Sequence, residues 1–271
     1  MGTEAKPSEG TVERWAFDLI HAETLADKLT PPAPPELWED APPVRRDLRP
    51  GRPPELRLAG RSAKTPKPGA LARPEARALL CHAFLHHEVQ AAELLCWALL
   101  AFPETPHAFR AGLLTIALDE LRHVGLYRAH LTRLGYSLTD FPVRDWFWER
   151  IPTCERPEQF CALMGMGLEG SNLDHATNFA RRFREVGDEE GAQLQERIAR
   201  EEVAHVRFAV HWFEVWTGGI EFERWVRELP EPLTPVLFRG KPIDRELRSL
   251  AGMPSSFLDE LASFRAPLIR K

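Results

Sequence analysis

The sequence predicts an all-α protein built around a four-helix bundle with one long crossover. From residue 74 onward, apolar residues recur at helical spacing in four long runs, and no run alternates long enough to predict a strand. The first two runs and the last two are each joined by a few residues, which predicts two antiparallel hairpins. Roughly twenty residues separate the hairpins, enough at ~3.3 Å per residue to cross a helix of ~25 residues.

The composition is that of an ordinary globular protein. The chain has 271 residues, of which 44% are hydrophobic, so it can form one large domain or two small ones. A net charge of -5 gives no reason to expect nucleic acid or an anionic membrane as a partner. No uncharged run reaches the ~18 residues of a membrane span, and residues 1–10 lack the layout of a secretory signal. We therefore expect a cytoplasmic protein.

Cysteine usage favours free thiols. Cys81, Cys96, Cys154 and Cys161 form no C-x-x-C pair, so neither a zinc ribbon nor a dithiol redox motif is predicted. Buried thiols that pack as small apolar residues are the expected outcome.

The N-terminal quarter is predicted to hold one helix and a proline-rich strap. Apolar residues at helical spacing predict a single amphipathic helix over residues 12–29. Half of the 24 prolines fall between Pro31 and Pro74, which excludes regular helix or a central strand there. Residues 45–73 contain nine Lys and Arg. We expect a solvated, extended strap over the surface, with an arm that contacts RNA or phosphate as the alternative.

The four long helices have recognisable ends. A helix over residues 75–101 follows Pro74 and stops at a turn with two prolines, and a second over residues 108–134 ends at Gly135. A third over residues 157–186 and a fourth over residues 190–216 also end at glycines.

Two short helices are expected near residues 243–250 and 254–264. The predicted organisation has three parts. Residues 1–74 form the N-terminal helix and strap, and residues 75–219 form the bundle. Residues 220–271 form a C-terminal helical extension that packs on the bundle.

A repeated Glu-x-x-His pattern marks the candidate site. Glu120 and His123 lie three residues apart, so their side chains project from one helix face on successive turns. With 29 Glu and 10 His, chance predicts about one such pattern, and the chain has three. The copy at residues 104–107 lies in the proline-flanked turn. The remaining copy, Glu202 and His205, lies on the fourth helix.

Each Glu-x-x-His is preceded by a lone glutamate on the other helix of its hairpin. Glu88 lies 32 residues before Glu120, and Glu169 lies 33 residues before Glu202, so each pair should meet at one depth around its turn. Their helix faces are otherwise apolar, and unpaired carboxylates are costly to bury. This is the ligand arrangement of carboxylate-bridged dimetal sites. The predicted ligands are Glu88, Glu120, His123, Glu169, Glu202 and His205.

We expect two Fe ions in this site, with Mn/Fe and Mn/Mn as alternatives. Glu93 remains an alternative to Glu88 if the turn between the first two long helices is longer than predicted. Four further residues are expected around the ligands. Asp119 and Glu201 precede the motif glutamates and could hold the imidazoles by hydrogen bonds. Tyr127 is a candidate for the cavity lining, and Asp174, one turn beyond Glu169, is a candidate partner of the ligands.

Four stretches resemble the successive signatures of a known family. They are HHEVQAAELLCWALLAFP, LDELRHVGLYRAHLTRLG, MGLEGSNLDHATNFARRF and EEVAHVRFAVHWF, and they look like the ferritin-like "domain of unknown function" family of bacterial proteins. RPGRPPEL and DFPVRDWFWE look like that family too, so the resemblance covers residues 48–216. It implies a ferritin-like bundle with the same six ligands. More distantly, the metal residues resemble those of the di-iron tRNA hydroxylase family.

These features predict a non-haem di-iron oxidoreductase. Such a protein would activate O2 and oxygenate or desaturate an organic substrate, a small molecule or nucleoside, using electrons from an external donor. No catalytic acid or base is predicted beyond the ligands. An iron-handling ferroxidase or a peroxide-detoxifying protein is the alternative, and a metal-free structural bundle is a third hypothesis.

Overall fold

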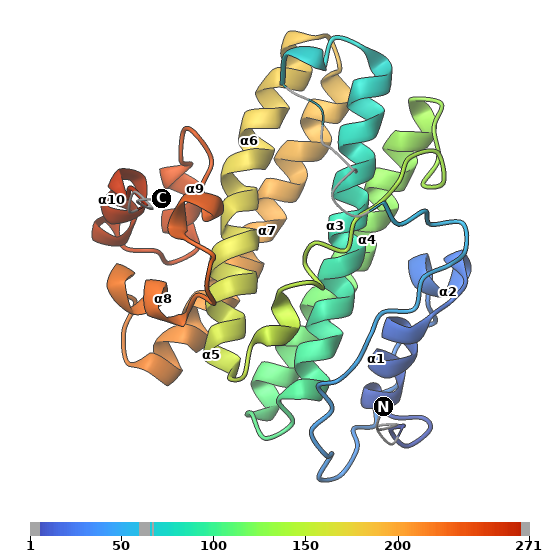
Figure 1. Cartoon of the computed structure of the whole chain (residues 1–271), viewed down its shortest axis with the longest axis vertical. Coiled ribbons are helices and arrows are strands. Elements are labelled where there is room, and N and C mark those ends of the chain that lie inside the picture. Colours follow the sequence, from blue (N-terminus) through green and yellow to red (C-terminus); the bar gives the residue numbers. More distant parts are fainter. Residues whose placement is uncertain (1–5, 60–65, 67, 267–271) are drawn as a thin grey trace. The chain divides into compact units, whose positions relative to one another are not determined.

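The computed structural model describes residues 6–59, 66 and 68–266, and all regular elements within them are helical (Figure 1). Two isolated β-bridges, Thr11 to Leu37 and Leu58 to Val143, are the other backbone pairings of note in these residues. The all-α fold class is therefore confirmed. The chain divides into two compact units, Met1–Pro152 and Thr153–Lys271, and each contains one of the predicted hairpins. The three-part division at residues 74 and 219 stays a prediction.

The hairpin of the first unit consists of α3 (Pro74–Ala101) and α4 (His107–Arg133), which pack along each other (Figure 1). Both sets of bounds agree with the prediction to within a residue. Pro74 occupies the first turn of α3, where its missing N–H costs nothing. Helix α3 is buried on nearly all sides, whereas α4 buries one face. Helix α3 is thus the centre of this unit's core.

The single N-terminal helix predicted over residues 12–29 is wrong. The structure has α1 (Val12–His21) and α2 (Leu25–Leu29) instead. The Thr24 side chain accepts a hydrogen bond from the Asp27 N–H and so begins a new helix. The buried Lys28 ammonium then donates to the Leu19 and Ile20 carbonyls at the end of α1. These side-chain contacts outweigh the continuous apolar pattern on which the prediction rested.

The proline-rich strap lacks long helices, as predicted, and its described part holds one short 3-10 helix, η2 (Pro68–Ala70). The strap was expected to be solvated and extended over the surface, and the structure shows it solvated in part and buried at some residues. Arg45 is 3% exposed, and its N–H donates to the Leu100 carbonyl at the end of α3. Gly51 donates to the Ile20 carbonyl, and a Cβ at this position would lie 2.4 Å from the His21 oxygen. The close approach of the strap to α1 therefore requires glycine.

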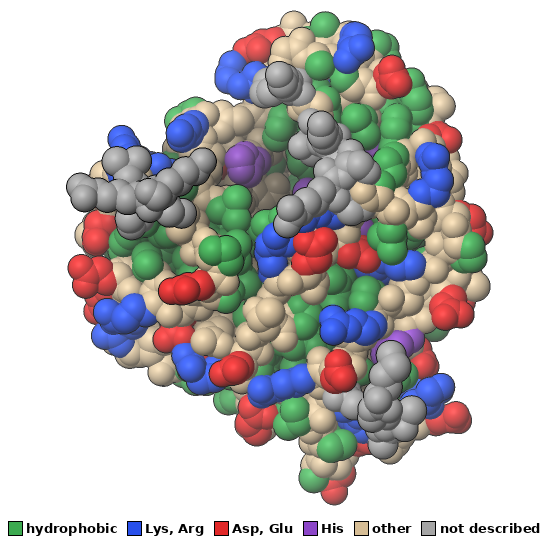
Figure 2. All heavy atoms as spheres, in the orientation of Figure 1, with side chains coloured by type: hydrophobic (Ala, Val, Ile, Leu, Met, Phe, Trp, Pro, Cys, Tyr) green, Lys and Arg blue, Asp and Glu red, His purple; other side chains and the backbone are tan. Residues whose placement is uncertain are grey.

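Three of the nine basic residues counted in the strap, Arg61, Lys64 and Lys67, lie outside the described residues. The alternative function of the strap as an arm for RNA or phosphate stays a prediction. On the face shown in Figure 2, basic and acidic side chains are interspersed.

The crossover contains the short 3-10 helix η3 (Ile151–Thr153), and the second unit then begins with three continuous helical segments. These are α5 (Pro157–Phe160), the π-helical segment η4 (Cys161–Glu169) and α6 (Gly170–Glu185). Together they cover the single helix predicted for residues 157–186, but the π segment was not predicted. Helix α7 (Glu189–Thr217) packs against both η4 and α6. It ends at Gly218, which is left-handed, as the predicted C-cap requires.

Gly165 sets the distance between η4 and α7. A Cβ at Gly165 would lie 2.1 Å from the Ala209 Cβ, far inside normal contact. The two helices can approach this closely only because position 165 lacks a side chain.

Three helices and a 3-10 turn complete the second unit. They are α8 (Phe222–Glu228), η5 (Pro235–Phe238), α9 (Arg245–Leu250) and α10 (Ser255–Ser263). The two short helices predicted here are confirmed as α9 and α10, whereas α8 was not predicted. Helix α9 packs on α6 and α7, and α8 packs on η4. The Trp225 indole donates to the Ala162 carbonyl inside η4, which fixes α8 against the π segment.

The four cysteines are buried and free, as expected. Burial raises the pKa of the Cys154 thiol to about 12, so this thiol is held in its unreactive form. Within the described residues, we find no helix with the length and apolar character that crossing a bilayer requires.

Candidate metal centre

The first unit brings three of the predicted ligands together. Glu88 lies on α3, and Glu120 and His123 lie on the facing surface of α4. One donor atom of each residue lies within 4.8 Å of the others. The His123 Nδ1 atom is 3.3 Å from the Glu120 Oε2 atom and 3.8 Å from the Glu88 Oε2 atom. Two buried carboxylates and one buried imidazole thus form a compact set of donors.

The electrostatics of this set favour a bound cation. Burial raises the pKa of Glu88 well above its usual value, and the adjacent Glu120 carboxylate raises it further, against an opposing hydrogen bond from His123. A metal ion between the carboxylates would remove this repulsion and stabilise both in ionised form. Carboxylate oxygen and imidazole nitrogen are donors that suit iron and manganese. The residues present therefore fit the predicted ions.

Glu88 and Glu93 have different partners in the structure. Glu93 lies next to two cations, with its Oε1 atom 2.7 Å from the Lys28 Nζ atom and 2.6 Å from the Arg52 Nη1 atom. Its Oε2 atom accepts a hydrogen bond of 2.6 Å from the Trp148 indole. Burial raises the pKa of Glu93, but Arg52 and Lys28 outweigh it and lower the pKa overall. The protein's own side chains neutralise Glu93, and Glu88 is the glutamate beside His123.

The second unit repeats the Glu-x-x-His arrangement on α7. The Glu202 Oε2 atom lies 2.9 Å from the His205 Nδ1 atom, and both side chains are buried. Glu169 is the last residue of η4 and is 8% exposed. Since η4 packs against α7, the unit supplies the lone glutamate and the pair from adjacent segments, as predicted.

Asp119 and Glu201 lie on the half-exposed sides of their helices. Asp119 accepts a hydrogen bond of 2.9 Å from Arg122, and Glu201 accepts one of 3.0 Å from Arg197. Their predicted hydrogen bonds to the imidazoles stay predictions. Tyr127 is buried, and its ring centre lies 5.8 Å from that of Phe84.

Asp174 has a structural environment. Its two oxygens accept hydrogen bonds of 2.9 Å from Arg248 and shorter ones from the N–H groups of Gly240 and Asp244. Both Asp174 and Arg248 are 0% exposed. These contacts fasten the segment between η5 and α9 to α6, and a role beside the ligands stays a prediction.

Sequence reasoning missed the cluster around Glu93. It joins Lys28 of α2, Arg52 of the strap and Asp145 of the crossover, whose carboxylate also accepts from His86. The available signal was Arg52 within the stretch RPGRPPEL, where an arginine flanked by proline and glycine is an unusual choice for a solvated strap. Nothing local connects it to Glu93, because the partners lie 41 residues apart.

Comparison with known proteins identifies the family of this chain. Residues 8–259 match the family described as "Protein of unknown function (DUF455)". The chain belongs to this family. It is the ferritin-like family that the sequence resembles, so that prediction is confirmed. An "Uncharacterized protein" of Haemophilus influenzae is 27% identical over 200 residues, which cover 70% of this chain and 69% of that protein. No solved structure matches.

Membership of the DUF455 family covers both hairpins and all six predicted ligands. Membership of this family does not indicate an activity. The chemistry has to be inferred from the donors themselves.

Proposed function

We propose that this protein is a dimetal-carboxylate oxidoreductase that uses O2 to oxygenate or desaturate an organic substrate. The observation that supports the proposal is the buried set of Glu88, Glu120 and His123, whose donor atoms lie within 4.8 Å of one another. The buried pair Glu202 and His205 repeats the Glu-x-x-His part of this set in the second unit.

In this proposal, each unit contributes one glutamate and one Glu-x-x-His to a shared site for two iron ions, or for manganese in one or both positions. The six ligands are Glu88, Glu120, His123, Glu169, Glu202 and His205. When bound, the metal pair supplies the redox chemistry that couples reduction of O2 to oxidation of a substrate, with electrons from an external donor.

The chain's own residues have three tasks. The carboxylates bind in ionised form, so metal loading releases the proton that burial and Glu120 favour on Glu88. The contacts between each histidine and its motif glutamate, at 3.3 Å and 2.9 Å, orient the imidazole Nδ1 atoms toward the carboxylates. The apolar helices exclude water, because neighbours such as Val124, Ile198 and Val206 are buried.

Metal analysis tests the proposal. Protein purified aerobically without chelator should hold about two iron or manganese ions per chain. Glu120→Ala and Glu202→Ala should each lose most of this metal, because each removes a ligand from the same site. Glu104→Ala is the matched control, since Glu104 belongs to the third Glu-x-x-His, is exposed and should leave the metal content unchanged.

Less than about one metal per chain, with no uptake on reconstitution, would contradict the proposal. If each ligand variant lost one metal and kept the other firmly, two separate sites would replace the shared one. Ferrous iron oxidation followed by release or storage of ferric iron, with no organic substrate oxidised, would favour the alternative function in iron handling.

A further inference from the structure

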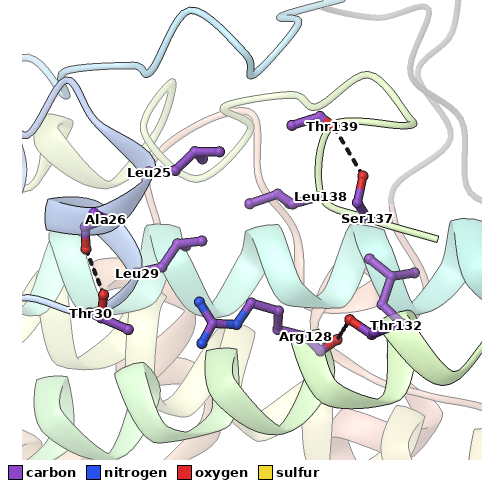
Figure 3. Close-up of a pocket in the computed structure, with 10 residues that line it drawn as sticks. Leu25, Ala26, Leu29, Thr30, Arg128, Thr132, Ser137, Leu138 and Thr139 are labelled. Atoms are coloured by element: carbon purple, nitrogen blue, oxygen red, sulfur yellow. Dashed lines mark hydrogen bonds between the residues drawn. The ribbon is translucent and has the colours of Figure 1, made fainter. Parts of the chain in front are cut away.

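A pocket lies between α2, the C-terminal half of α4 and the loop that follows α4 (Figure 3). All of its lining residues belong to the first unit. Its volume is about 410 Å³, within the range of small-molecule sites. None of the predicted ligands or their neighbours lines it.

The walls of the pocket are apolar. Leu29, Leu131 and Leu138 are buried within the fold at 8%, 0% and 5% exposure, and Leu25 adds a half-buried side chain. Figure 3 shows the leucines of α2 on one side and Leu138 on the other. A small aliphatic chain bound here would remove apolar surface from water. This burial would stabilise the complex by roughly 25 cal/mol per Å² of area buried.

Arg128 gives the pocket a positive charge. Its side chain is exposed, and Figure 3 shows the guanidinium extending toward Leu29 and Thr30. Among the residues that the structure describes, none accepts a hydrogen bond from this guanidinium. Other arginines of α4 differ, since Arg122 donates to Asp119 and Arg133 contacts the His130 ring. Arg128 is therefore available for an anion.

Hydroxyl groups complete the polar side of the pocket. Ser137 and Thr139 contact each other at 3.0 Å, and Thr132 donates to the Arg128 carbonyl. Asp140 follows in the same loop, but its carboxylate accepts a hydrogen bond from the Ser137 N–H. The polar side thus combines the Arg128 guanidinium with hydroxyl groups, while the nearby Asp140 carboxylate accepts a backbone hydrogen bond.

We propose that this pocket binds an aliphatic monocarboxylate of medium chain length. The chain would lie against the leucines, and the carboxylate would accept two hydrogen bonds from the Arg128 fork. Arg128 lies five residues after His123 on α4, or about 7.5 Å along the helix at ~1.5 Å per residue, and the lining includes none of the six predicted ligands. This is therefore a second site, and the inference does not rest on the proposed function.

Isothermal titration of the full chain with octanoate tests this assignment. The wild type should bind octanoate in a one-to-one complex. Arg128→Gln should weaken binding about tenfold or more, because it removes a charge-assisted pair. Ala26→Phe, which places a ring in the pocket, should abolish binding. Arg122→Gln is the matched control from the same helix and should bind as the wild type does.

Octanol separates the contribution of the charge from that of the apolar walls. It should bind the wild type and Arg128→Gln equally, because it carries no carboxylate. Circular dichroism of each variant identifies any loss of fold. Absence of octanoate binding to folded wild type, or equal affinity for folded Arg128→Gln, would overturn the inference.

Discussion

The two buried glutamates of α3 have opposite electrostatic surroundings. Glu88 faces another carboxylate, Glu120, and the pKa of Glu88 is raised by burial and by that charge. Glu93 faces Lys28 and Arg52, and its pKa is lowered. One helix therefore holds one carboxylate next to a second carboxylate and another carboxylate between two cations. This contrast favours Glu88 over Glu93 as the proposed ligand and gives Glu93 a structural ion pair.

Glu93→Gln should destabilise the metal-free protein by about 3–5 kcal/mol, because the buried Lys28 loses its carboxylate partner and the buried Arg52 keeps only Asp145. Lys28 can release its proton, which limits its share of the loss, whereas Arg52 stays charged and loses one of its two carboxylate partners. Urea unfolding in the presence of a chelator measures the change in the free energy of unfolding.

Glu88→Gln is the matched control. It removes a carboxylate repelled by Glu120, so the metal-free protein should keep its stability or gain some. If Glu88→Gln were the strongly destabilising change and Glu93→Gln the neutral one, the assignment of the two glutamates would be reversed.

Six candidate ligand positions follow from the sequence because their signal is local, and the structure brings Glu88, Glu120 and His123 of this set together. A Glu-x-x-His pattern fixes two side chains on one helix face, and equal spacing around a turn places the lone glutamate. The choice between Glu88 and Glu93 could not be predicted in this way. It depends on Lys28 and Arg52, which reach Glu93 only through the tertiary fold.

At the scale of elements, the approach of η4 to α7 depends on Gly165. The π-helical segment carries Glu169 at its end, and α7 carries Glu202 and His205. Because a Cβ at Gly165 would meet Ala209 at 2.1 Å, any side chain there must move the two segments apart. The position of Glu169 relative to Glu202 and His205 thus depends on Gly165, which is not itself a predicted ligand.

Gly165→Ala should lower the free energy of unfolding by about 1–3 kcal/mol through overpacking. Adding Ala209→Gly removes the methyl group that it meets, so the double variant should lose less than the sum of the two single changes. Gly125→Ala in α4 is the control, because a Cβ there meets nothing within 4 Å and should stabilise the helix slightly. Strict additivity in chemical denaturation would refute the contact.

Helix bounds were predictable where the apolar period is long and the ends carry proline or glycine, as in α3 and α7. The predicted bounds were wrong where side-chain hydrogen bonds of a few residues interrupt a helix despite a continuous apolar pattern. Thr24 and Lys28 divide α1 from α2, and nothing in the helical pattern of residues 12–29 shows this break. The π segment was missed because residues 161–167 are all buried, so the sequence there carries no one-sided period that separates a π-helix from an α-helix.

At the scale of the whole molecule, two compact units each contain one long hairpin with the same order of predicted ligands. The fold class and the order of helices followed from apolar period and connection length alone. The ion pair that fixes the C-terminal residues to α6 could not be predicted from these signals, because Asp174 and Arg248 lie 74 residues apart in the chain.

Asp174→Asn should destabilise the second unit by about 3–5 kcal/mol, because it leaves the buried Arg248 without its counter-charge. Limited proteolysis should then cleave after α7, releasing fragments that begin within residues 219–245. Asp259→Asn is the control, since its ion pair with Arg245 is exposed and contributes little. An unchanged cleavage pattern in Asp174→Asn would show that other contacts hold this segment.

The strap also has a consequence for synthesis of the chain. Arg52 binds Asp145, which lies 93 residues later, as well as Glu93. At about 5–20 residues per second, a ribosome needs about 5–20 s to complete this interval. Glu93 is made after 41 of these residues, whereas Asp145 comes at the end of the interval, so the full cluster around Arg52 cannot form until the crossover has been translated.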